Sequence, residues 1–486
     1  MHIKKDVSIS FYKNCDGSGR EQRKEFAKEI LIMTKQKIRE IWFREIEAQR
    51  ELTKSRCERD IEKYRKGDKK IVLKNKDGRT LANKRVAIHQ KSHDFNFGAN
   101  IFMLDEFSDE KDNTAYREIF KKYFNAATVP FYWEGIEPEE GKLRFEKGSP
   151  KVFRRPAPDL CLEYCNENGI SPKLHCLFYD KYMAIPDWLP KKDEKKMREL
   201  YEKRFCEISE RYRGKMMEVE VTNEILCAPY WSENDGISSV LSYKKNTVEW
   251  AFDLAKKYFP NDKLIINEGN PMLHTIAKEG YFSKYYLQLE KLIAKGTPID
   301  KIGIQNHIFY GATLPAGEEP ADDKIPGYSI YFNPDNYFKG LDFLSEFGLP
   351  LEITEHTIPT PGEGEEAELI QADLLENLYT IWFSIPKMET VMYWNIVDKT
   401  CYVGKGWNEN NCRGGLFHRD FTPKKAAERL YYLMNEKWHT DLVLTSDENG
   451  EIDFRGFYGN YTVEIDGEEY EFSLHKDESS CFELSL

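Results

Sequence analysis

The sequence has no run of about 18 consecutive apolar residues, the length that a membrane-spanning helix requires. Its first residues, Met1-His2-Ile3-Lys4-Lys5, are followed by no apolar stretch, so they lack the pattern of a secretory signal peptide. These absences argue against a membrane protein and favour a cytoplasmic location. A secreted protein whose leader has been removed is the alternative that this pattern leaves open.

Metal-binding and redox motifs are also missing. Ten cysteines are spread along the chain, and no two have the CxxC spacing of zinc and thioredoxin-like motifs. Several of them, including Cys161, Cys165 and Cys176, fall inside segments that read as helices or strands, and such scattered thiols fit a reducing compartment. The ten histidines form neither an HxH nor an HExxH motif. The sequence therefore predicts no metal ligands and no cofactor.

Positive charge is scarce relative to negative charge, with a formal net charge of −12 over 486 residues. This balance argues against nucleic acid or an anionic membrane surface as the main partner, whereas neutral ligands remain open. Aromatic residues make up 14% of the chain, more than a core requires. Sugar-binding clefts use such aromatic faces, although core packing accounts for part of the excess. The oligomeric state is not predicted.

The middle of the chain alternates apolar or β-branched runs with helical patterns, which is typical of a (β/α)8 TIM barrel in the α/β class. A doubly wound open sheet is the alternative, but no glycine-rich phosphate loop follows any run. The eight runs predicted as strands are Phe95–Phe102, Ala126–Trp133, Pro172–Tyr179, Glu218–Glu224, Lys263–Asn267, Lys301–Phe309, Pro350–His356 and Thr390–Ile396.

Both ends of the chain differ from this pattern. We expect residues 1–92 to contain an early strand at 6–12, a long helix at about 23–64 and a β-hairpin made by residues 70–78 and 84–90, joined at Asp77-Gly78. Residues 93–437 form the barrel, and residues 438–486 alternate as strands. The two ends together are expected to make a small accessory β-sandwich-like domain on the closed side of the barrel.

Two of the predicted strands end in the same way, with β-branched residues, a threonine and then a glutamate. Glu224 ends the fourth strand and Glu355 ends the seventh. Because active residues of such barrels lie at the C-terminal ends of the strands, both carboxyls should reach one mouth. We predict that they form a catalytic pair. The same mouth should receive polar or aromatic residues from other strands: His175, Gln305, His307 and Trp394.

These motifs resemble glycoside hydrolase family 10, the retaining endo-β-1,4-xylanase family, over roughly residues 90–437. Val221-Thr222-Asn223-Glu224 resembles its acid/base motif, and Ile353-Thr354-Glu355 resembles its nucleophile motif. Further segments are similar to the family's strands one, two, three, six and eight: Phe95–Asn100, Trp133–Phe145, Leu174-His175, Asp300–His307 and Tyr393–Asp398. The resemblance implies an oligo- or polysaccharide substrate, most directly β-1,4-xylan or xylo-oligosaccharides.

The resemblance also implies a set of residues that contact the sugar: His175, Asn223, Gln305, His307 and Trp394. Tyr179, Trp133 and Tyr402 are candidate platforms for further sugars, with core packing an open alternative for the first two. By the same resemblance, Glu224 first protonates the leaving oxygen and then acts as a base, while Glu355 attacks the anomeric carbon. This division of labour requires the pKa values of the two groups to differ, with that of Glu224 raised.

The sequence departs from the family pattern at three places. Pro130-Phe131-Tyr132-Trp133-Glu134 has no lysine where the family has one that grips the sugar next to the scissile bond. Thr357 replaces an aspartate that pairs with the strand-six histidine, which leaves the charge of His307 open. Tyr179-Asp180 replaces a Trp-His pair. The missing lysine predicts a preference for short, decorated or otherwise unusual β-glycosides over long linear xylan.

Three other functions remain open at this stage. The first is a retaining hydrolase of another β-glycoside, and the second is a carbohydrate-binding barrel without activity. The third is a barrel enzyme of a different reaction type, such as a lyase or a metal-dependent hydrolase. The presence of both glutamates argues against the second. Loss of activity on chelation would favour the third.

Overall fold

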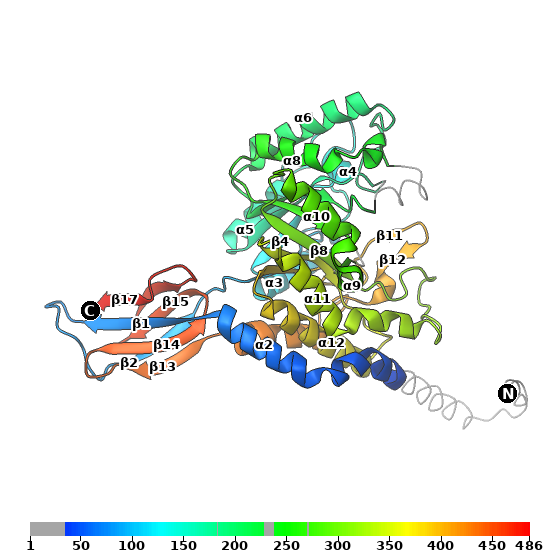
Figure 1. Ribbon diagram of the computed structural model, residues 1–486. Helices are drawn as coiled ribbons and strands as arrows, with labels where there is room; N and C mark the ends of the chain where they lie inside the picture. Colours follow the sequence, from blue (N-terminus) through cyan, green and yellow to red (C-terminus); the bar gives the residue numbers. More distant parts are fainter. Residues whose placement is uncertain (1–34, 182, 228–237, 270–271) are drawn as a thin grey trace, which may run out of the picture.

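The computed structural model describes residues 35–486 apart from 182, 228–237 and 270–271 (Figure 1). The strand predicted at residues 6–12 and the first part of the predicted helix lie outside these residues. Residues 35–48 are helical, and α2 (Arg50–Tyr64) continues in the same direction along α12 (Glu365–Ser384).

The eight predicted runs form a closed parallel barrel in the order β10-β3-β4-β5-β6-β7-β8-β9. The strands are β3 (Asn96–Asn100), β4 (Ala126–Pro130), β5 (Ser171–Phe178), β6 (Glu218–Asn223), β7 (Leu264–Glu268), β8 (Lys301–His307), β9 (Leu351–Thr357) and β10 (Met388–Tyr393). The barrel closes where β10 pairs in parallel with β3, with Thr390 opposite Asn96. The predicted (β/α)8 barrel is confirmed, and the doubly wound alternative is wrong.

Helices connect these strands and cover the outside of the barrel. Their bounds are α3 (Glu110–Tyr123), α4 (Trp133–Ile136), α5 (Pro158–Glu167), α6 (Glu194–Tyr212), α8 (Thr247–Tyr258), α9 (Met272–Glu279), α10 (Lys284–Ala294), α11 (Pro334–Ser345) and α13 (Lys425–Tyr432). Helix α3 illustrates how the local sequence starts a helix and determines which face is buried. The Asp109 side chain accepts from the Lys111 backbone N–H, and Tyr116, Phe120 and Tyr123 recur at helical spacing on the buried face.

Because helices cover the outside and side chains fill the inside, nearly every strand residue is buried, which explains why the strands read as continuous apolar runs. The floor of the barrel is charged nonetheless. The Lys173 ammonium lies 2.7 Å from Glu352 and 3.2 Å from Glu220, and Lys301 lies 2.7 Å from Glu218. These two lysines and three glutamates are all buried, and Lys301 also lies 3.2 Å from the half-buried Glu389.

The accessory strands make two sheets that pack face to face, as predicted for the chain ends. One sheet has the order β14-β1-β17 and the other β13-β2-β15-β16. The strands are β1 (Lys66–Lys74), β2 (Arg85–Gln90), β13 (Asp441–Thr445), β14 (Glu451–Phe457), β15 (Gly459–Ile465), β16 (Glu468–Leu474) and β17 (Cys481–Ser485). Apolar side chains of both sheets, such as Ile71 and Val463, form a separate small core.

The predicted β-hairpin of residues 70–78 and 84–90 is wrong. Gly78 has the left-handed φ expected of a turn, but β1 pairs with β14 and β17, whereas β2 pairs with β13 and β15. Each strand has one apolar face, and these faces meet across the sandwich core, where Leu73 and Ile88 are both fully buried. Because β1 and β2 lie in opposite sheets, packing of the sheets buries both apolar faces at once. Strands from the other end of the chain pair with each of them on both sides.

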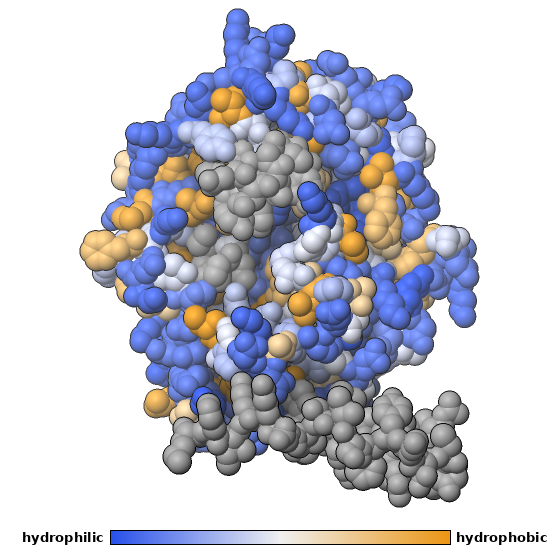
Figure 2. Space-filling model, turned by 90° about the vertical axis from the view of Figure 1, so that its right-hand side faces the viewer, coloured by the Kyte–Doolittle hydropathy of each residue, from blue (hydrophilic) through white to orange (hydrophobic). Residues whose placement is uncertain are grey.

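The sandwich adjoins the end of the barrel at which the strands begin. The Arg65 guanidinium donates to the Phe383 carbonyl at the end of α12, and Phe457 of β14 packs against the Phe383 ring. This arrangement leaves the other end of the barrel, where the strands finish, free of the sandwich. Figure 2 shows that face as mostly hydrophilic, with scattered hydrophobic residues. None of the helices in the described part of the chain is long and apolar enough to cross a membrane.

Candidate active site

Glu224 follows directly after β6 and has a φ of 54°, a left-handed conformation that a non-glycine residue seldom adopts. Such strain persists where surrounding contacts enforce it. Here the Glu224 carboxylate accepts from the Tyr179 hydroxyl at 2.9 Å and from Gln305 Nε2 at 3.1 Å, and the Lys181 ammonium lies 3.6 Å away. These contacts aim the carboxylate across the barrel mouth.

Glu355 lies within β9 and is buried. One of its oxygens is 3.1 Å from both Asn267 Nδ2 and Gln305 Nε2, and the other is 3.1 Å from His307 Nε2. Three neutral nitrogen donors therefore surround one carboxyl group, and together they fix its orientation.

Gln305 joins the two carboxyls. Its Nε2 lies 3.1 Å from an oxygen of Glu224 and 3.1 Å from an oxygen of Glu355, so these two oxygens are no further apart than twice that distance. Carboxyls about 5–5.5 Å apart suit direct attack on an anomeric carbon, whereas about 6.5–9.5 Å leaves room for a water. The spacing fits the first arrangement.

The two pKa values differ, but in the sense opposite to the expected one. Burial raises the pKa of Glu355 to about 8, and Glu220 and Glu224 add to the rise, against the lowering effect of His175. Burial also raises the pKa of Glu224, but Lys181, Gln305 and Tyr179 together lower it by more than burial raises it. The pKa of Glu224 therefore lies below its ordinary value. The expected raised pKa of Glu224 is therefore not found in the ligand-free site, because Lys181 stands beside it.

His175 lies beneath Glu355 in β5. Its Nδ1 is 2.9 Å from Glu220, its Nε2 is 2.9 Å from the Tyr132 hydroxyl, and Glu355 is 4.0 Å away. Burial lowers the pKa of His175, but Glu220 and Glu355 raise it above its ordinary value. The imidazole thus joins Glu220 of β6 and Glu355 of β9 in one network.

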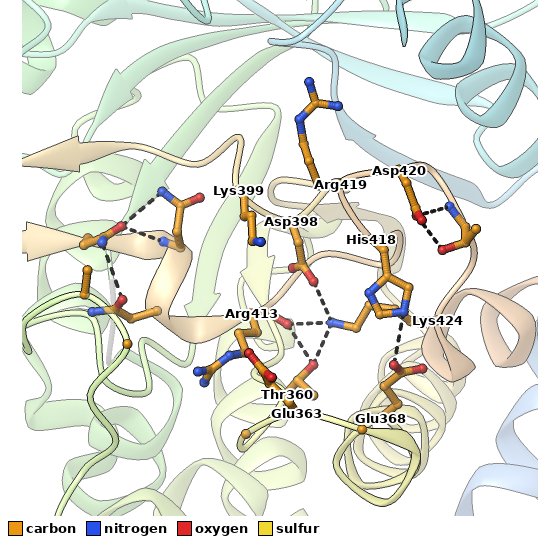
Figure 3. Close-up of a pocket in the computed structure, with 18 of the residues that line it drawn as sticks. Thr360, Glu363, Glu368, Asp398, Lys399, Arg413, His418, Arg419, Asp420 and Lys424 are labelled. Atoms are coloured by element: carbon orange, nitrogen blue, oxygen red, sulfur yellow. Dashed lines mark hydrogen bonds and ion pairs between the residues drawn. The ribbon is translucent and has the colours of Figure 1, made fainter.

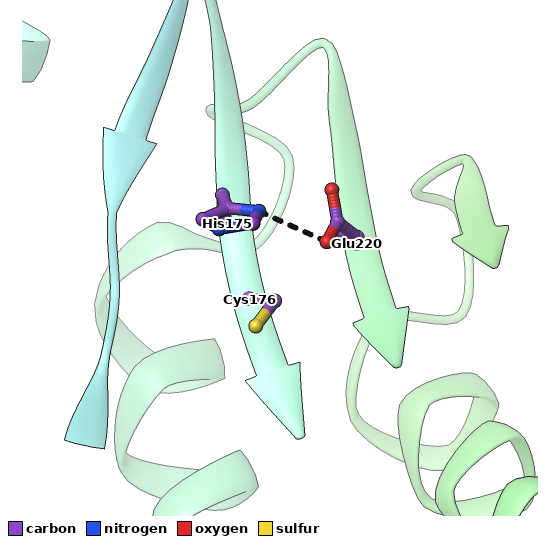
Figure 4. Close-up of side chains that lie close together, drawn as sticks. All are labelled: His175, Cys176 and Glu220. Carbon is purple, nitrogen blue, oxygen red and sulfur yellow. Dashed lines mark hydrogen bonds and ion pairs between the residues drawn. The ribbon is translucent and has the colours of Figure 1, made fainter. Parts of the chain in front are cut away.

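Figure 4 shows that His175, Cys176 and Glu220 lie close enough together for their donor atoms to suggest a metal site. Both ring nitrogens of His175 already have hydrogen-bond partners, and Glu220 also faces the Lys173 ammonium at 3.2 Å. Burial raises the pKa of the Cys176 thiol well above its ordinary value, which disfavours the thiolate that a metal needs. We assign this group to the network that supports Glu355.

His307 has a partner in spite of the departure at position 357. Its Nδ1 lies 2.9 Å from the Thr357 hydroxyl and its Nε2 lies 3.1 Å from Glu355. Burial lowers the pKa of His307 to about 4, so the ring is neutral near pH 7. A neutral ring that donates from Nε2 to the Glu355 carboxylate accepts the threonine hydroxyl at Nδ1. Threonine thus supplies a partner in place of the aspartate, and the charge of His307, which the sequence left open, is that of a neutral ring.

Asn223 is held rather than free. Its side-chain oxygen accepts from Asn267 Nδ2 at 2.9 Å and from Gln305 Nε2 at 3.1 Å. This leaves the Asn223 amide nitrogen as the group available to a ligand. Asn267, at the end of β7, was not predicted, although its position as a polar residue closing an apolar run is a signal that could have found it.

Aromatic residues surround the pair. Trp394 is only 6% exposed, with its ring centre 5.0 Å from that of Phe102 and 5.7 Å from those of His175 and His307. Tyr402, in the loop after β10, is half-buried and lines a cavity of about 650 Å³. The structure thus brings Trp394, Tyr402 and Tyr179 to the mouth.

Trp133 does not join them. It is 3% exposed on α4, donates from Nε1 to Glu137 at 2.9 Å and packs edge-on against Trp188 and Tyr201. The alternative of core packing applies to this residue, because the strand ends three positions earlier and the helix turns the ring away from the mouth.

Two other charged residues near Glu224, namely Lys181 and Glu268, were not identified from the sequence. Lys181 lies in the loop after β5 and carries no sequence signal beyond its charge. Glu268 ends β7, is fully buried and accepts from the Leu226 backbone N–H at 3.1 Å. Burial and the neighbouring Glu224 raise the pKa of Glu268 well above its ordinary value. Glu268 therefore anchors the segment that follows Glu224.

A larger cavity, of about 970 Å³, lies between the loops that follow β9 and β10 (Figure 3). Its charged walls are paired. The buried Lys424 ammonium donates to Thr360 and to the Arg413 carbonyl and lies 3.3 Å from Asp398, while His418 faces Glu368 at 3.1 Å. These contacts hold the two loops together, and neither Glu224 nor Glu355 lines this cavity.

A (β/α)8 barrel with two carboxyls bridged at its C-terminal mouth defines the class of protein: it has the architecture of barrel glycosidases. A model of the family described as Glycosyl hydrolase family 10 matches residues 89–432. The chain belongs to this family.

Relatives with known names match at low identity. Anti-sigma-I factor RsgI6 of Acetivibrio thermocellus is 26% identical over 86% of this chain, and Endo-1,4-beta-xylanase 1 of Arabidopsis thaliana is 25% identical over 84%. The chain covers only 48% and 37% of those proteins. Both alignments extend beyond the 89–432 family match, so they include part of the flanking segments.

Among solved structures, xylanase 10B of Thermotoga petrophila RKU-1 in complex with xylobiose is similar with a TM-score of 0.53 at 22% identity, over 71% of this chain and 95% of that one. Native xylanase 10B of Thermotoga maritima gives the same TM-score and identity, over 71% and 96%. At this identity the similarity supports the barrel fold.

Proposed function

We propose that the protein is a retaining glycoside hydrolase that cleaves β-1,4-xylosidic bonds in xylan or xylo-oligosaccharides by double displacement. The observation that carries the proposal is the bridging of Glu224 and Glu355 by one amide nitrogen of Gln305 at 3.1 Å to each. Family membership and the xylanases among its relatives support the choice of substrate.

In the first step, Glu355 attacks the anomeric carbon while Glu224 gives its proton to the leaving oxygen. The glycosidic C–O bond breaks, and a glycosyl ester forms on Glu355. In the second step, Glu224 takes a proton from water, the water oxygen attacks the anomeric carbon, and the ester bond to Glu355 breaks. Two inversions retain the configuration, and both carboxyls return to their starting states.

The productive state needs a proton on Glu224, whereas the ligand-free pair holds its single proton on Glu355 at neutral pH, as their pKa values imply. Lys181 and Tyr179 occupy the Glu224 oxygen that the leaving group must approach. A sugar in the aglycone position competes with these donors for Glu224. Their displacement raises its proton affinity and moves the shared proton toward the acid.

The surrounding residues bind the reacting sugar. Asn223 offers its free amide nitrogen to the 2-hydroxyl, a contact that strengthens in an oxocarbenium-like transition state. His175 and Gln305 orient Glu355 from below and from the side. Trp394 provides the apolar floor. Tyr402 is a platform for the next sugar.

A retaining hydrolase of another β-glycoside is the second candidate, because Tyr132 stands where the family lysine contacts the sugar. Its hydroxyl bonds His175 and its ring is covered by Arg155, so the position cannot offer an ammonium. A silent carbohydrate-binding barrel is disfavoured, since nothing in the carboxyl pair or its donors is missing.

We also propose that the protein works in a reducing compartment such as the cytoplasm, and that residues 1–92 and 438–486 act as one accessory unit around the barrel of residues 93–437. The cysteines in the described residues are all free, and most are buried. Strand β1 pairs with β14 and β17, which ties the two ends of the chain together.

Hydrolysis of xylo-oligosaccharides and an aryl β-xyloside tests the function, with the anomers followed by NMR. Wild type should release the β-anomer first, and Glu355→Gln should lose activity. Glu366→Gln removes an exposed carboxylate from α12 and serves as the control with unchanged activity. Release of the α-anomer first, or turnover by Glu355→Gln at the wild-type rate, contradicts the proposal. Turnover confined to other β-glycosides selects the second candidate.

A further inference from the structure

Arg155 lies in the segment before α5 and is 9% exposed. Its guanidinium carbon is 3.9 Å from the centre of the Tyr132 ring. Its aliphatic stem packs on Gly135, where an added Cβ would lie 2.8 Å from Cγ and Cδ of Arg155. A glycine below and a tyrosine ring beside it fix the position of this side chain.

The hydrogen bonds of Arg155 are incomplete. Its Nη1 donates to the Arg154 carbonyl at 3.0 Å, whereas its buried Nε has no partner. Among the described residues, no carboxylate lies within ion-pair distance of its guanidinium. The neighbouring Arg154 differs, since it donates to the Thr400 carbonyl and to Asn395. A buried cation without a counter-ion is costly, so the position favours an anion supplied from outside.

Arg155 lines the cavity of about 650 Å³ together with Tyr402 and Met183. Two acidic residues also line it. Asp187 is fully exposed and faces Lys191 at 3.4 Å, and Glu134 affects Arg155 only through its more distant charge. Tyr132 connects the cavity to the reacting centre, because its hydroxyl bonds His175, which lies 4.0 Å from Glu355. Tyr132 thus links Arg155 in the wall of the cavity to the hydrogen-bond network of Glu355.

We propose that Arg155 binds the carboxylate of an acidic sugar, a uronic acid unit or branch of the substrate. The guanidinium of Arg155 borders the cavity, and charge-assisted hydrogen bonds from a guanidinium to a carboxylate are among the strong ones. Glu134 also lines this cavity. A carboxylate, with its single charge, therefore suits the cavity better than a phosphate does. This inference rests on the proposed hydrolase function and narrows it to a class of decorated substrates.

Two matched substrates test the proposal: a xylo-oligosaccharide with a glucuronic acid branch, and the same compound with its carboxyl reduced to the alcohol. Wild type should show a kcat/KM at least about tenfold higher for the acidic compound, the discrimination expected of one charge-assisted contact. Arg155→Met should bring the ratio of the two kcat/KM values close to one. Structural damage lowers both values together and leaves this ratio unchanged.

Lys399→Met removes an exposed cation elsewhere at the mouth and should leave the ratio as in wild type. If Arg155→Met does not fold, Arg155→Lys keeps the charge, loses the planar guanidinium and should lower the ratio. Inhibition of wild type by free glucuronate but not by glucose provides support without any variant. A wild-type ratio of one, or a ratio that survives in Arg155→Met, overturns the inference. No turnover of either compound or of unbranched xylo-oligosaccharides overturns the proposed function instead.

Discussion

The Lys181 ammonium lies 3.6 Å from the Glu224 carboxylate, on the oxygen that also accepts from Tyr179. A cation beside a general acid favours the wrong protonation state in the free enzyme. Together with the raised pKa of Glu355, it gives a pair that shares one proton and keeps it on Glu355, the nucleophile of the proposed mechanism, in the ligand-free site.

The pH dependence of kcat/KM should follow this shared proton. Activity falls when both carboxyls are protonated, below the lowered pKa of Glu224, and when both are ionised, above about 8 for Glu355. The profile is therefore a bell with its acid limb below 4.5 and its alkaline limb near pH 8. Initial rates at low substrate across this range measure it. An alkaline limb near pH 5 contradicts the account.

Replacing Lys181 by methionine should move the acid limb to higher pH. The substitution removes a positive charge that stabilises ionised Glu224, so the pKa of Glu224 rises and the bell narrows from its acid side. Lys181→Arg keeps the charge and should leave the limb near its wild-type position. An acid limb at the same pH in wild type and Lys181→Met shows that Lys181 does not act on the acid.

Gln305→Met should lower kcat by about tenfold to a hundredfold, because each hydrogen bond to a charged group contributes about 1.5–3 kcal/mol. The methionine leaves the two carboxyls without their common donor. Asn306, the next residue on β8, points away and accepts from Tyr337 at 3.1 Å. Asn306→Ala should lower the thermal midpoint while kcat stays near wild type. Equal losses of kcat in both variants would show that Gln305 acts only on the fold.

Lys173→Met should reduce the free energy of unfolding by about 3–5 kcal/mol, since it removes the buried ammonium that lies between Glu220 and Glu352. Urea denaturation followed by circular dichroism measures the change. Lys121→Met removes an exposed lysine paired with Glu118 and should cost about 0–1 kcal/mol. A similar cost for the two variants contradicts the role assigned to the charged floor.

The strands of the barrel were predictable because burial on both faces leaves a continuous apolar run with a polar residue at its end. The same signal found Glu224 and Glu355. Contacts between distant loops left no such trace: Lys181 approaches Glu224 from the β5 loop, and Arg155 reaches Tyr132 across α4. The β1–β2 hairpin failed for a related reason, since local turn chemistry marked Asp77-Gly78 while pairing was decided by strands about 370 residues further on.

Covalent trapping tests the central claim most directly. A 2-deoxy-2-fluoro-β-xylobioside with a dinitrophenyl leaving group should inactivate the wild-type enzyme and label one peptide, which tandem mass spectrometry assigns to Glu355. Glu224→Ala should still be labelled, because so good a leaving group needs no acid, but should release the sugar more slowly. A label on a residue other than Glu355, or steady turnover of this compound with no ester ever captured, would contradict the double-displacement account.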